Sequence, residues 1–487
     1  MERLNASSVV DARPPQPRKF PETAGSKHPT IEYTLPDNVE ANLDKHQINA
    51  LGYMVRAVRR IGEVYLEQSR PETAKLQEPF YPAGISRQEV REAGKVNPAI
   101  LSPYTIVTRT ESGLEAVPQH LYYQAIIKKK GIVDLLQRAA KEIHKSKQKD
   151  PQLESYLKAR ALAFQTGNFE PSEAIWLTRD DEPIINIVIG FYDTYTDRFL
   201  GLKFAAQAWV DILEPETTRH AQWFQERLLD LQEQKTGHPS PRIKLRVAHL
   251  RAAGGQAGHK EWAGQSQPCQ REWREKYGSR LTIWIEPLAL KFRTRKLPAY
   301  KLFVNPINIR GTQDYVVRLA NLRTHTGHET FHALLLSENI DELGDEKNWI
   351  KELNCDLNAL VRYREIAGVN PRESEAAMAL KLAESYVDYE DRETRKEYHE
   401  ASTILLNYLI QRGSVWIENG LITWSDTQQV FNDMQALLTE IEDLIEKGKV
   451  ARVREIKSQY HNPEIYKYLV TKQSFPYPNS KRKLTGD

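Results

Sequence analysis

The pentapeptide His328-Glu329-Thr330-Phe331-His332 is the most informative stretch of the chain. Residues i and i+4 of a helix lie on one face, so His328 and His332 can offer their imidazoles to a single metal ion. Glu329 lies beside them, where a carboxylate can polarise a water molecule bound to that ion. The pattern predicts a helix that carries two metal ligands and a general base.

A third ligand is expected about twenty residues later, in the segment Glu352-Leu353-Asn354-Cys355-Asp356, which also has helical periodicity. Two histidines and Glu352 would leave Zn²⁺ an open position for water, as a catalytic site requires. Asp356, four residues on, is expected to hold a ligand histidine by a hydrogen bond. Cys355 is expected to point elsewhere, as a packed thiol rather than a soft ligand. The alternative is a surface helix with solvated histidines and acids.

Composition limits the classes of protein to which the chain can belong. With 487 residues, 40% of them hydrophobic and 27% charged, it has the balance of a soluble globular protein. It is too long for a single core, so two lobes are expected. No run is long and apolar enough to span a bilayer, and no apolar stretch follows the start, so we expect a cytoplasmic protein without a membrane partner.

Charge and cysteine content narrow the classes further. The chain has 68 basic and 65 acidic residues, so no strong field attracts nucleic acid. Cys269 and Cys355 cannot form a disulfide framework and are expected to be free thiols. A peptide or small-molecule substrate is the expected partner. Charge and cysteine content do not predict an oligomeric state.

Periodicity predicts an α+β fold with a mixed α/β lobe and a mainly helical zinc-binding lobe. Strands are expected at 184–189, near 243–247, at 281–285 and at 301–304, and a long loop or a lobe boundary between Gly237 and Gln270. The active site is expected in the cleft between the lobes. The predicted organisation is a flexible proline-rich arm (1–35), the first part of the mixed lobe (36–213), a helical segment and long loop (214–275), strands of the mixed lobe (276–306), the helical zinc-binding lobe (307–470) and a C-terminal tail (471–487).

The chain resembles the zinc-dependent dipeptidyl peptidase III family and its shorter relatives, some of them fused to Nudix domains in plants. Three segments carry the resemblance, in the family's order: Gly190 to Phe199, which is similar to Gly-Phe-Ile-Glu-Ser-Tyr-Arg-Asp-Pro-Phe; the two metal-binding segments; and Glu397-Tyr398-His399-Glu400. The first metal motif has five residues, HExxH, where the peptidase proper has HExxGH.

The resemblance implies a role for each matching residue. It implies that His328, His332 and Glu352 bind zinc, that Glu329 is the general base and that Asp356 supports a ligand. It implies that Tyr195 and His399 stabilise the oxyanion that forms when water attacks a carbonyl, a contribution often worth a few kcal/mol. Asp193 stands where the family has a glutamate that receives a peptide's free amino group.

One segment departs from the family pattern. Where the family has Asn-x-Pro-Asn to grip the substrate backbone, this chain has Ile285-Glu286-Pro287-Leu288. With both amides replaced by Ile285 and Leu288, we expect a more apolar substrate site that selects extended peptides poorly. A zinc hydrolase is the first expectation. The alternatives are a zinc-dependent lyase or isomerase acting on an apolar small molecule, and a silent binding protein, against which the intact Glu329 argues.

Overall fold

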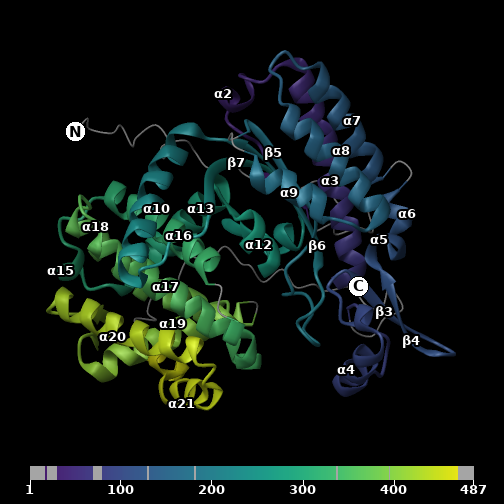
Figure 1. Ribbon diagram of the computed structural model, residues 1–487. Helices are drawn as coiled ribbons and strands as arrows, with labels where there is room; N and C mark the ends of the chain where they lie inside the picture. Colours follow the sequence, from purple (N-terminus) through teal and green to yellow (C-terminus); the bar gives the residue numbers. More distant parts are fainter. Residues whose placement is uncertain are drawn as a thin grey trace, which may run out of the picture. The chain divides into compact units, whose positions relative to one another are not determined.

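The computed structural model describes residues 17–18, 30–69, 79–128, 131–179, 183–260, 262–335, 338–393 and 395–469. These residues form two compact units. The mixed unit contains the described residues up to Thr218 together with Arg242–Pro287, and the helical unit contains Arg219–Pro241 and the chain from Leu288 on. The predicted α+β class is confirmed, because one unit holds a sheet and the other is mostly helical (Figure 1).

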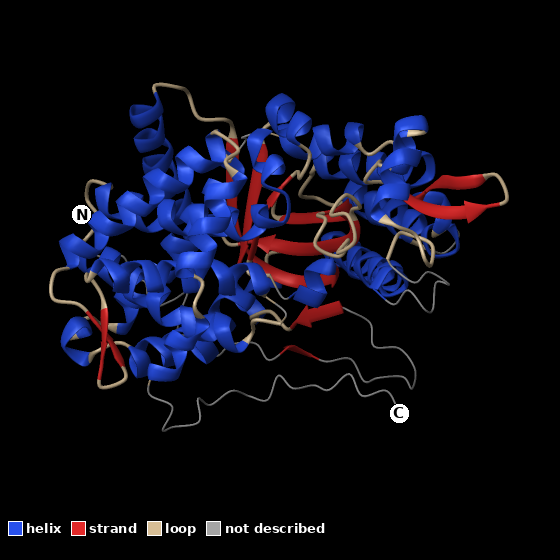
Figure 2. Ribbon diagram, turned by 90° about the horizontal axis from the view of Figure 1, so that it is seen from below, coloured by secondary structure: helices blue, strands red, loops and turns tan. Residues whose placement is uncertain are grey.

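The mixed unit is built on a seven-stranded sheet with the strand order β1-β2-β7-β6-β5, in which β9 also pairs with β7 and β8 with β9. Figure 2 shows these strands in red. All neighbouring strands are antiparallel except β7 and β9. The strands of this unit are β1 (Pro17–Arg18), β2 (Thr30–Tyr33), β3 (Thr105–Thr110), β4 (Gly113–Pro118), β5 (Ile185–Tyr192), β6 (Ala205–Leu213), β7 (Ile243–Gly255), β8 (Gly264–Gln267) and β9 (Ser279–Trp284).

Helices pack against this sheet, and even β5, at the end of the strand order, is buried along its length. Every residue of β5 is buried, as expected of a strand with an almost continuous apolar sequence. A Cβ at Gly254 of β7 would lie 2.3 Å from the carbonyl oxygen of Val58, so only glycine allows this close approach of a helix to the strand. The helices of this unit are α2 (Asp37–Glu40), α3 (Lys45–Ser69), α4 (Arg87–Val96), α5 (Gln119–Tyr122), α6 (Gln124–Ile127), α7 (Ile132–Lys145), α8 (Pro151–Thr166), α9 (Glu170–Thr178), α11 (Gln256–Lys260) and α12 (Arg271–Tyr277).

The helical unit packs long helices around its own apolar core. A short hairpin of β10 (Trp416–Glu418) and β11 (Leu421–Thr423) accompanies them. No helix among the residues described is long and apolar enough to cross a membrane. The helices of the helical unit are α10 (Pro215–Thr236), α13 (Ile285–Lys291), α14 (Leu297–Phe303), α15 (Pro306–Ile309), α16 (Asp314–Leu334), α17 (Lys347–Glu365), α18 (Pro371–Glu390), α19 (Lys396–Arg412), α20 (Thr427–Glu446) and α21 (Val450–Tyr460). The first turn of α10 belongs to the mixed unit, and α13 spans the boundary between the units.

Several local predictions were wrong. The strand expected at 301–304 is helical up to Phe303, because Pro298 lies in the first turn of α14 and its apolar residues Ala299, Tyr300 and Phe303 face the core with helical spacing. The loop expected between Gly237 and Gln270 is largely filled by β7, α11 and β8. The alternative for this segment, a lobe boundary, agrees with the division between the two units at Pro241 and Arg242.

The predicted tail (471–487) and most of the predicted arm (1–35) lie outside the described residues. The part of the arm that is described does not lie loosely on the surface. Thr30–Tyr33 forms β2, pairs with β7 and buries Glu32 and Tyr33.

Candidate metal centre

Helices α16 and α17 approach closely at the predicted metal site. A Cβ at Gly327, the residue before His328, would lie 3.1 Å from the Cβ of Ala359 on α17. The next turn of α16 is tied to α10, because Gln225 Nε2 donates to Thr330 Oγ1 at 3.2 Å. Small residues at the helix contact therefore allow α17 to face the two histidines of α16.

The structure brings the three predicted ligands together. The ligand atoms of His328, His332 and Glu352 lie within 4.8 Å of one another. The two Nε2 atoms are 2.9 Å apart, and each lies 3.2 Å from Glu352 Oε2. Within the described part of the chain no group forms a hydrogen bond to this buried oxygen.

These separations fit a tetrahedral metal ion. Nitrogen and oxygen ligands about 2.0 to 2.2 Å from zinc lie about 3.3 Å from each other in a tetrahedral site. The observed 2.9 and 3.2 Å are close to that value. A buried carboxylate oxygen that faces two imidazole nitrogens is stabilised by positive charge, which a protonated histidine or a bound cation can supply. The donor set and its geometry therefore suit a divalent cation that accepts nitrogen and oxygen ligands.

Asp356 contacts the far side of the His328 ring, as predicted. Its Oδ1 lies 2.8 Å from His328 Nδ1, and its Oδ2 lies 2.6 Å from Lys381 Nζ on α18. Asp356 and Lys381 are both buried. The carboxylate thus fixes the orientation of the imidazole, and the ammonium balances the carboxylate's charge.

The pKa shifts show how strongly these groups interact. Burial alone would lower the pKa of His328, but Asp356 and Glu352 outweigh it and raise that pKa to about 10. Burial lowers the pKa of His332 to about 4, helped by the charge of His328 and opposed by Glu352. Burial opposes ionisation of Glu352 and Asp356, yet their cationic neighbours hold both carboxyl pKa values below their usual range. The site is therefore built to hold negative carboxylates against positive charge.

Cys355 also faces the metal centre, against the sequence-based expectation. Its Sγ lies 3.3 Å from His332 Nδ1, the ring nitrogen opposite the ligand atom. The expectation failed because position i+3 lies on nearly the same helical face as positions i and i+4, so Glu352, Cys355 and Asp356 share one face. Burial raises the pKa of the Cys355 thiol well above its usual range.

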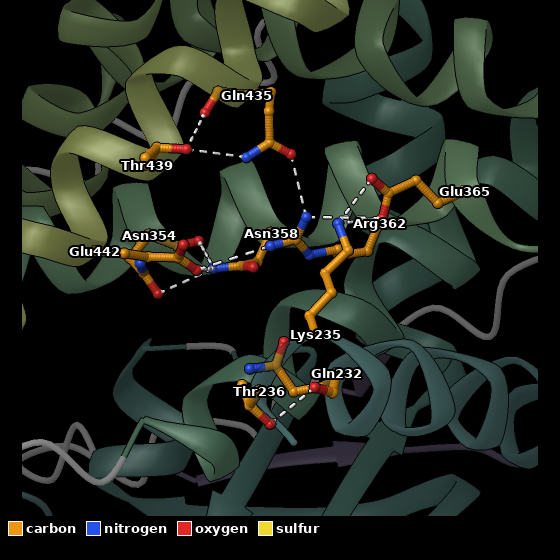
Figure 3. A network of polar contacts seen from close by, with 10 residues as sticks. All are labelled: Gln232, Lys235, Thr236, Asn354, Asn358, Arg362, Glu365, Gln435, Thr439 and Glu442. Atoms are coloured by element: carbon orange, nitrogen blue, oxygen red, sulfur yellow. Dashed lines mark hydrogen bonds and ion pairs between the residues drawn. The ribbon is translucent and has the colours of Figure 1, made fainter. Parts of the chain in front are cut away.

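The opposite side of α17 is fixed by a polar network (Figure 3). Asn358 Nδ2 donates to Glu442 Oε1 of α20 at 3.2 Å and to the backbone carbonyl of Asn354 at 3.1 Å. One turn further on, Arg362 donates to Gln435 Oε1 at 3.1 Å. These contacts hold the helix that carries Glu352 at a defined rotation about its axis.

Glu329 on α16 and Tyr398 on α19 lie in the electrostatic surroundings of Glu352. Glu329 is half-buried on α16. Burial raises the pKa of the Tyr398 hydroxyl on α19, and the charges of Glu352, Glu397 and Glu329 raise it further against the opposing Arg395. A phenol therefore lies within electrostatic reach of both the ligand Glu352 and the predicted base.

His399 is buried in the same unit as the ligands. Its Nδ1 lies 3.2 Å from Thr403 Oγ1, and its ring packs 5.3 Å from His461 and 5.6 Å from Tyr389, measured between centroids. Burial lowers its pKa to about 4, and His461 and Arg392 add to the effect. His399 is therefore neutral near pH 7 and keeps one ring N–H as a hydrogen-bond donor.

Asp193 and Tyr195 belong to the mixed unit and follow β5 directly. Asp193 has a left-handed backbone conformation, with φ of 54°. Tyr195 is half-buried, and its ring packs 5.8 Å from that of Trp262. The other predicted residues of this group lie on α13, where Ile285 is half-buried and Leu288 is buried.

The carboxylate of Asp193 is already engaged within the mixed unit. Its Oδ2 accepts hydrogen bonds from the side-chain amides of Gln207 at 3.0 Å and Gln267 at 3.1 Å, and also from Gln265. Its Oδ1 accepts from the Cys269 thiol at 2.7 Å. A substrate amino group that bound here would have to compete with these four donors.

Glu286 holds the start of α13 against β7. Its Oε1 lies 2.7 Å from His249 Nδ1, and its Oε2 accepts the backbone N–H of Leu250 at 2.7 Å. The segment Ile285–Leu288 is therefore anchored to β7 by its own glutamate.

Sequence reasoning missed Lys381 and Tyr398 and misjudged Cys355. The periodicity of α17 could have placed Cys355 correctly, since its spacing from Glu352 is helical. The sequence has no signal for Lys381, because its partner Asp356 is on another helix, 25 residues away.

Among the comparisons with known proteins, those with solved structures show the fold. No family model matches the chain. Nudix hydrolase 3 of Arabidopsis thaliana is 26% identical over 124 residues, which are 26% of this chain and only 15% of that protein. Two solved structures, DPP III from Caldithrix abyssi and dipeptidyl-peptidase III from Corallococcus sp. strain EGB, each have a TM-score of 0.74 and 17% identity. The alignments cover 89% of this chain, and 93% and 91% of those chains. The chain therefore has the fold of dipeptidyl peptidase III.

Proposed function

We propose that this protein is a zinc-dependent hydrolase, resembling a peptidase, in which Glu329 activates a water molecule for attack on an amide carbonyl. The observation that carries the proposal is the group formed by His328, His332 and Glu352, whose ligand atoms lie within 4.8 Å of one another. The likeness in fold to dipeptidyl peptidase III structures supports the same reaction class. Bound there, zinc would supply a Lewis acid that lowers the pKa of water and polarises the carbonyl.

The remaining chemistry belongs to side chains of this chain. Glu329 takes the proton from the attacking water and passes it to the leaving amine. His399, which lies in the same unit as these groups, donates a hydrogen bond to the oxygen of the carbonyl as negative charge develops on it. The same role for Tyr195, in the mixed unit, stays a prediction. Asp356 and Lys381 keep the His328 ring in one orientation, so the ligand geometry does not have to reorganise during the reaction.

The substrate class is the less supported part of the proposal. The amine-binding role of Asp193 stays a prediction, and its four internal donors favour a substrate without a free amino group at that position. The same observation favours the second candidate, a zinc-dependent lyase or isomerase of an apolar small molecule. Hydrolysis remains the first choice because Glu329 and the three ligands suffice for it.

The test compares Glu329→Gln with the parental protein on a panel of free and N-acylated arylamide reporters. We expect the variant to keep its zinc and its fold and to lose most turnover, because a neutral amide cannot accept the proton. Glu365→Gln, which changes an exposed carboxylate on α17, should retain parental rates. Parental turnover by Glu329→Gln would show that another residue is the base, and absence of turnover on the whole panel would favour the lyase or isomerase.

A further inference from the structure

The two ligand histidines have chemically different supports behind them. A histidine that binds a metal through one ring nitrogen normally donates its other N–H to a carboxylate, a carbonyl or water, which fixes the ring and raises its basicity. His328 has the carboxylate of Asp356 at 2.8 Å, balanced by Lys381. His332 has the sulfur of Cys355 at 3.3 Å.

The geometry assigns the hydrogen-bond roles. The Nε2 atom of His332 faces Glu352 Oε2 at 3.2 Å and is the ligand atom, so a neutral ring that binds metal carries its proton on Nδ1. Nδ1 is the atom that contacts the sulfur of Cys355. A thiol sulfur is a weak acceptor, so this support raises the basicity of the imidazole less than a carboxylate does.

A second observation places the thiol on the same helical face as two other residues of the site. Glu352, Cys355 and Asp356 occupy positions i, i+3 and i+4 of α17. One helical face therefore supplies a metal ligand, the contact to His328 and the contact to His332. All three side chains are buried, and the polar network on the other side of α17 fixes the rotation that presents them.

We propose that Cys355 is the positioning residue for His332, acting as the acceptor of the Nδ1 hydrogen bond and not as a metal ligand. The inference rests on the metal site of the proposed function. Its consequence is a centre in which a carboxylate contacts the ring of His328 and a thiol sulfur contacts the ring of His332.

Two substitutions separate positioning from packing. Cys355→Ser keeps an acceptor at the same place, whereas Cys355→Val keeps about the same volume and removes the acceptor. A positioning role requires that serine preserve metal binding better than valine. A merely packed thiol requires the opposite order, because a buried hydroxyl is tolerated less well than a buried methyl group.

The experiment titrates Co²⁺ into the parental protein and both variants, followed by the visible absorption of the bound ion. We expect Cys355→Val to bind Co²⁺ about 10-fold more weakly than the parental protein, which is the lower end of the losses in affinity caused by removal of a group that supports a metal ligand. Its visible spectrum should also shift, because His332 reorients. Cys355→Ser should bind Co²⁺ within about 3-fold of the parental affinity, because it keeps an acceptor for the Nδ1 hydrogen bond. Cys269→Ser, in the mixed unit, should match the parental protein.

Three results would overturn the proposal. A near-ultraviolet sulfur-to-cobalt charge-transfer band that is lost in both Cys355 variants would make the sulfur a ligand. Equal affinities for serine and valine, or tighter binding by valine, would leave only a packing role. Failure of the parental protein to bind Co²⁺ would remove the metal site itself, and with it both the proposed function and this inference. Thermal unfolding of each variant confirms that it is folded. If Cys355→Val does not fold, the test depends on Cys355→Ser alone. A folded Cys355→Ser that binds Co²⁺ more than about 3-fold more weakly than the parental protein then contradicts the proposal.

Discussion

Lys381 Nζ lies 2.6 Å from Asp356 Oδ2, and the other oxygen of the same carboxylate lies 2.8 Å from His328 Nδ1. A buried ammonium on α18 is thereby connected to the predicted metal ligand His328 on α16 through one carboxylate on α17. Charged groups from three helices therefore stabilise one another at the site. A substitution of Lys381 on α18 should affect His328 on α16, although the two side chains are connected only through Asp356.

Removal of that ammonium should destabilise the helical unit. We expect Lys381→Met to lower the free energy of unfolding by about 3 to 5 kcal/mol, because the charge of Asp356 stays buried without its partner. Denaturant unfolding measures this. Lys301→Met, which breaks an exposed pair with Asp314, should cost less than about 1 kcal/mol. Equal losses in the two variants would contradict the account.

Neutralising Asp356 should weaken metal binding more than it harms the fold. In Asp356→Asn the side chain keeps its size but loses the charge that orients and polarises His328, so we expect zinc affinity to fall by roughly 10- to 100-fold. Competition with a chromophoric chelator measures the affinity. Unchanged affinity in the folded variant would show that His328 needs no support.

The pH dependence of stability should reveal His399. Its pKa is about 4 in the folded protein against a usual 6.5, because burial disfavours the charged ring. Between these values the unfolded chain binds more protons than the folded one, so stability falls as pH falls from 6.5 towards 4. We expect His399→Gln to lose stability less steeply over this window, by thermal unfolding. The exposed His144→Gln should follow the parental curve, and a His399→Gln curve with the parental slope would argue against the assignment.

Ordinary dipeptidyl arylamide reporters should be poor substrates. The resemblance places Ile285 and Leu288 where the dipeptidyl peptidase III family has amides, and Asp193 accepts hydrogen bonds from Gln207, Gln265, Gln267 and Cys269. We expect N-acetylated reporters to be cleaved at least as well as those with free amino groups, compared by kcat/KM. Tyr195→Phe and His399→Ala should impair whichever reaction proves native. Efficient release of free dipeptides, lost in Glu329→Gln, would restore the plain dipeptidyl peptidase interpretation.

The sequence was sufficient for the parts of the site that depend on local periodicity. His328, His332, Glu352 and Asp356 could be placed on two helical faces from spacing alone, and the structure brings them together. Lys381 could not, because its contact with Asp356 depends on how α18 packs against α17. Cys355 was misjudged although its helical spacing was visible.

The fold predictions likewise succeeded where the local sequence was sufficient and failed where packing partners decided the structure. The strand around 184–189 was predictable, because an apolar, β-branched run between Pro183 and Gly190 has few alternatives. The run at 301–304 was not, since a short apolar segment suits a strand and a buried helix equally until its packing partners are known.

The central claim is that His328, His332 and Glu352 hold one zinc ion. Elemental analysis of the purified parental protein beside His332→Ala tests it most directly, with His144→Ala as the control for loss of an exposed histidine. The account predicts stoichiometric zinc in the parental protein and in His144→Ala, and little or none in folded His332→Ala. Equal zinc in the parental protein and His332→Ala would contradict it.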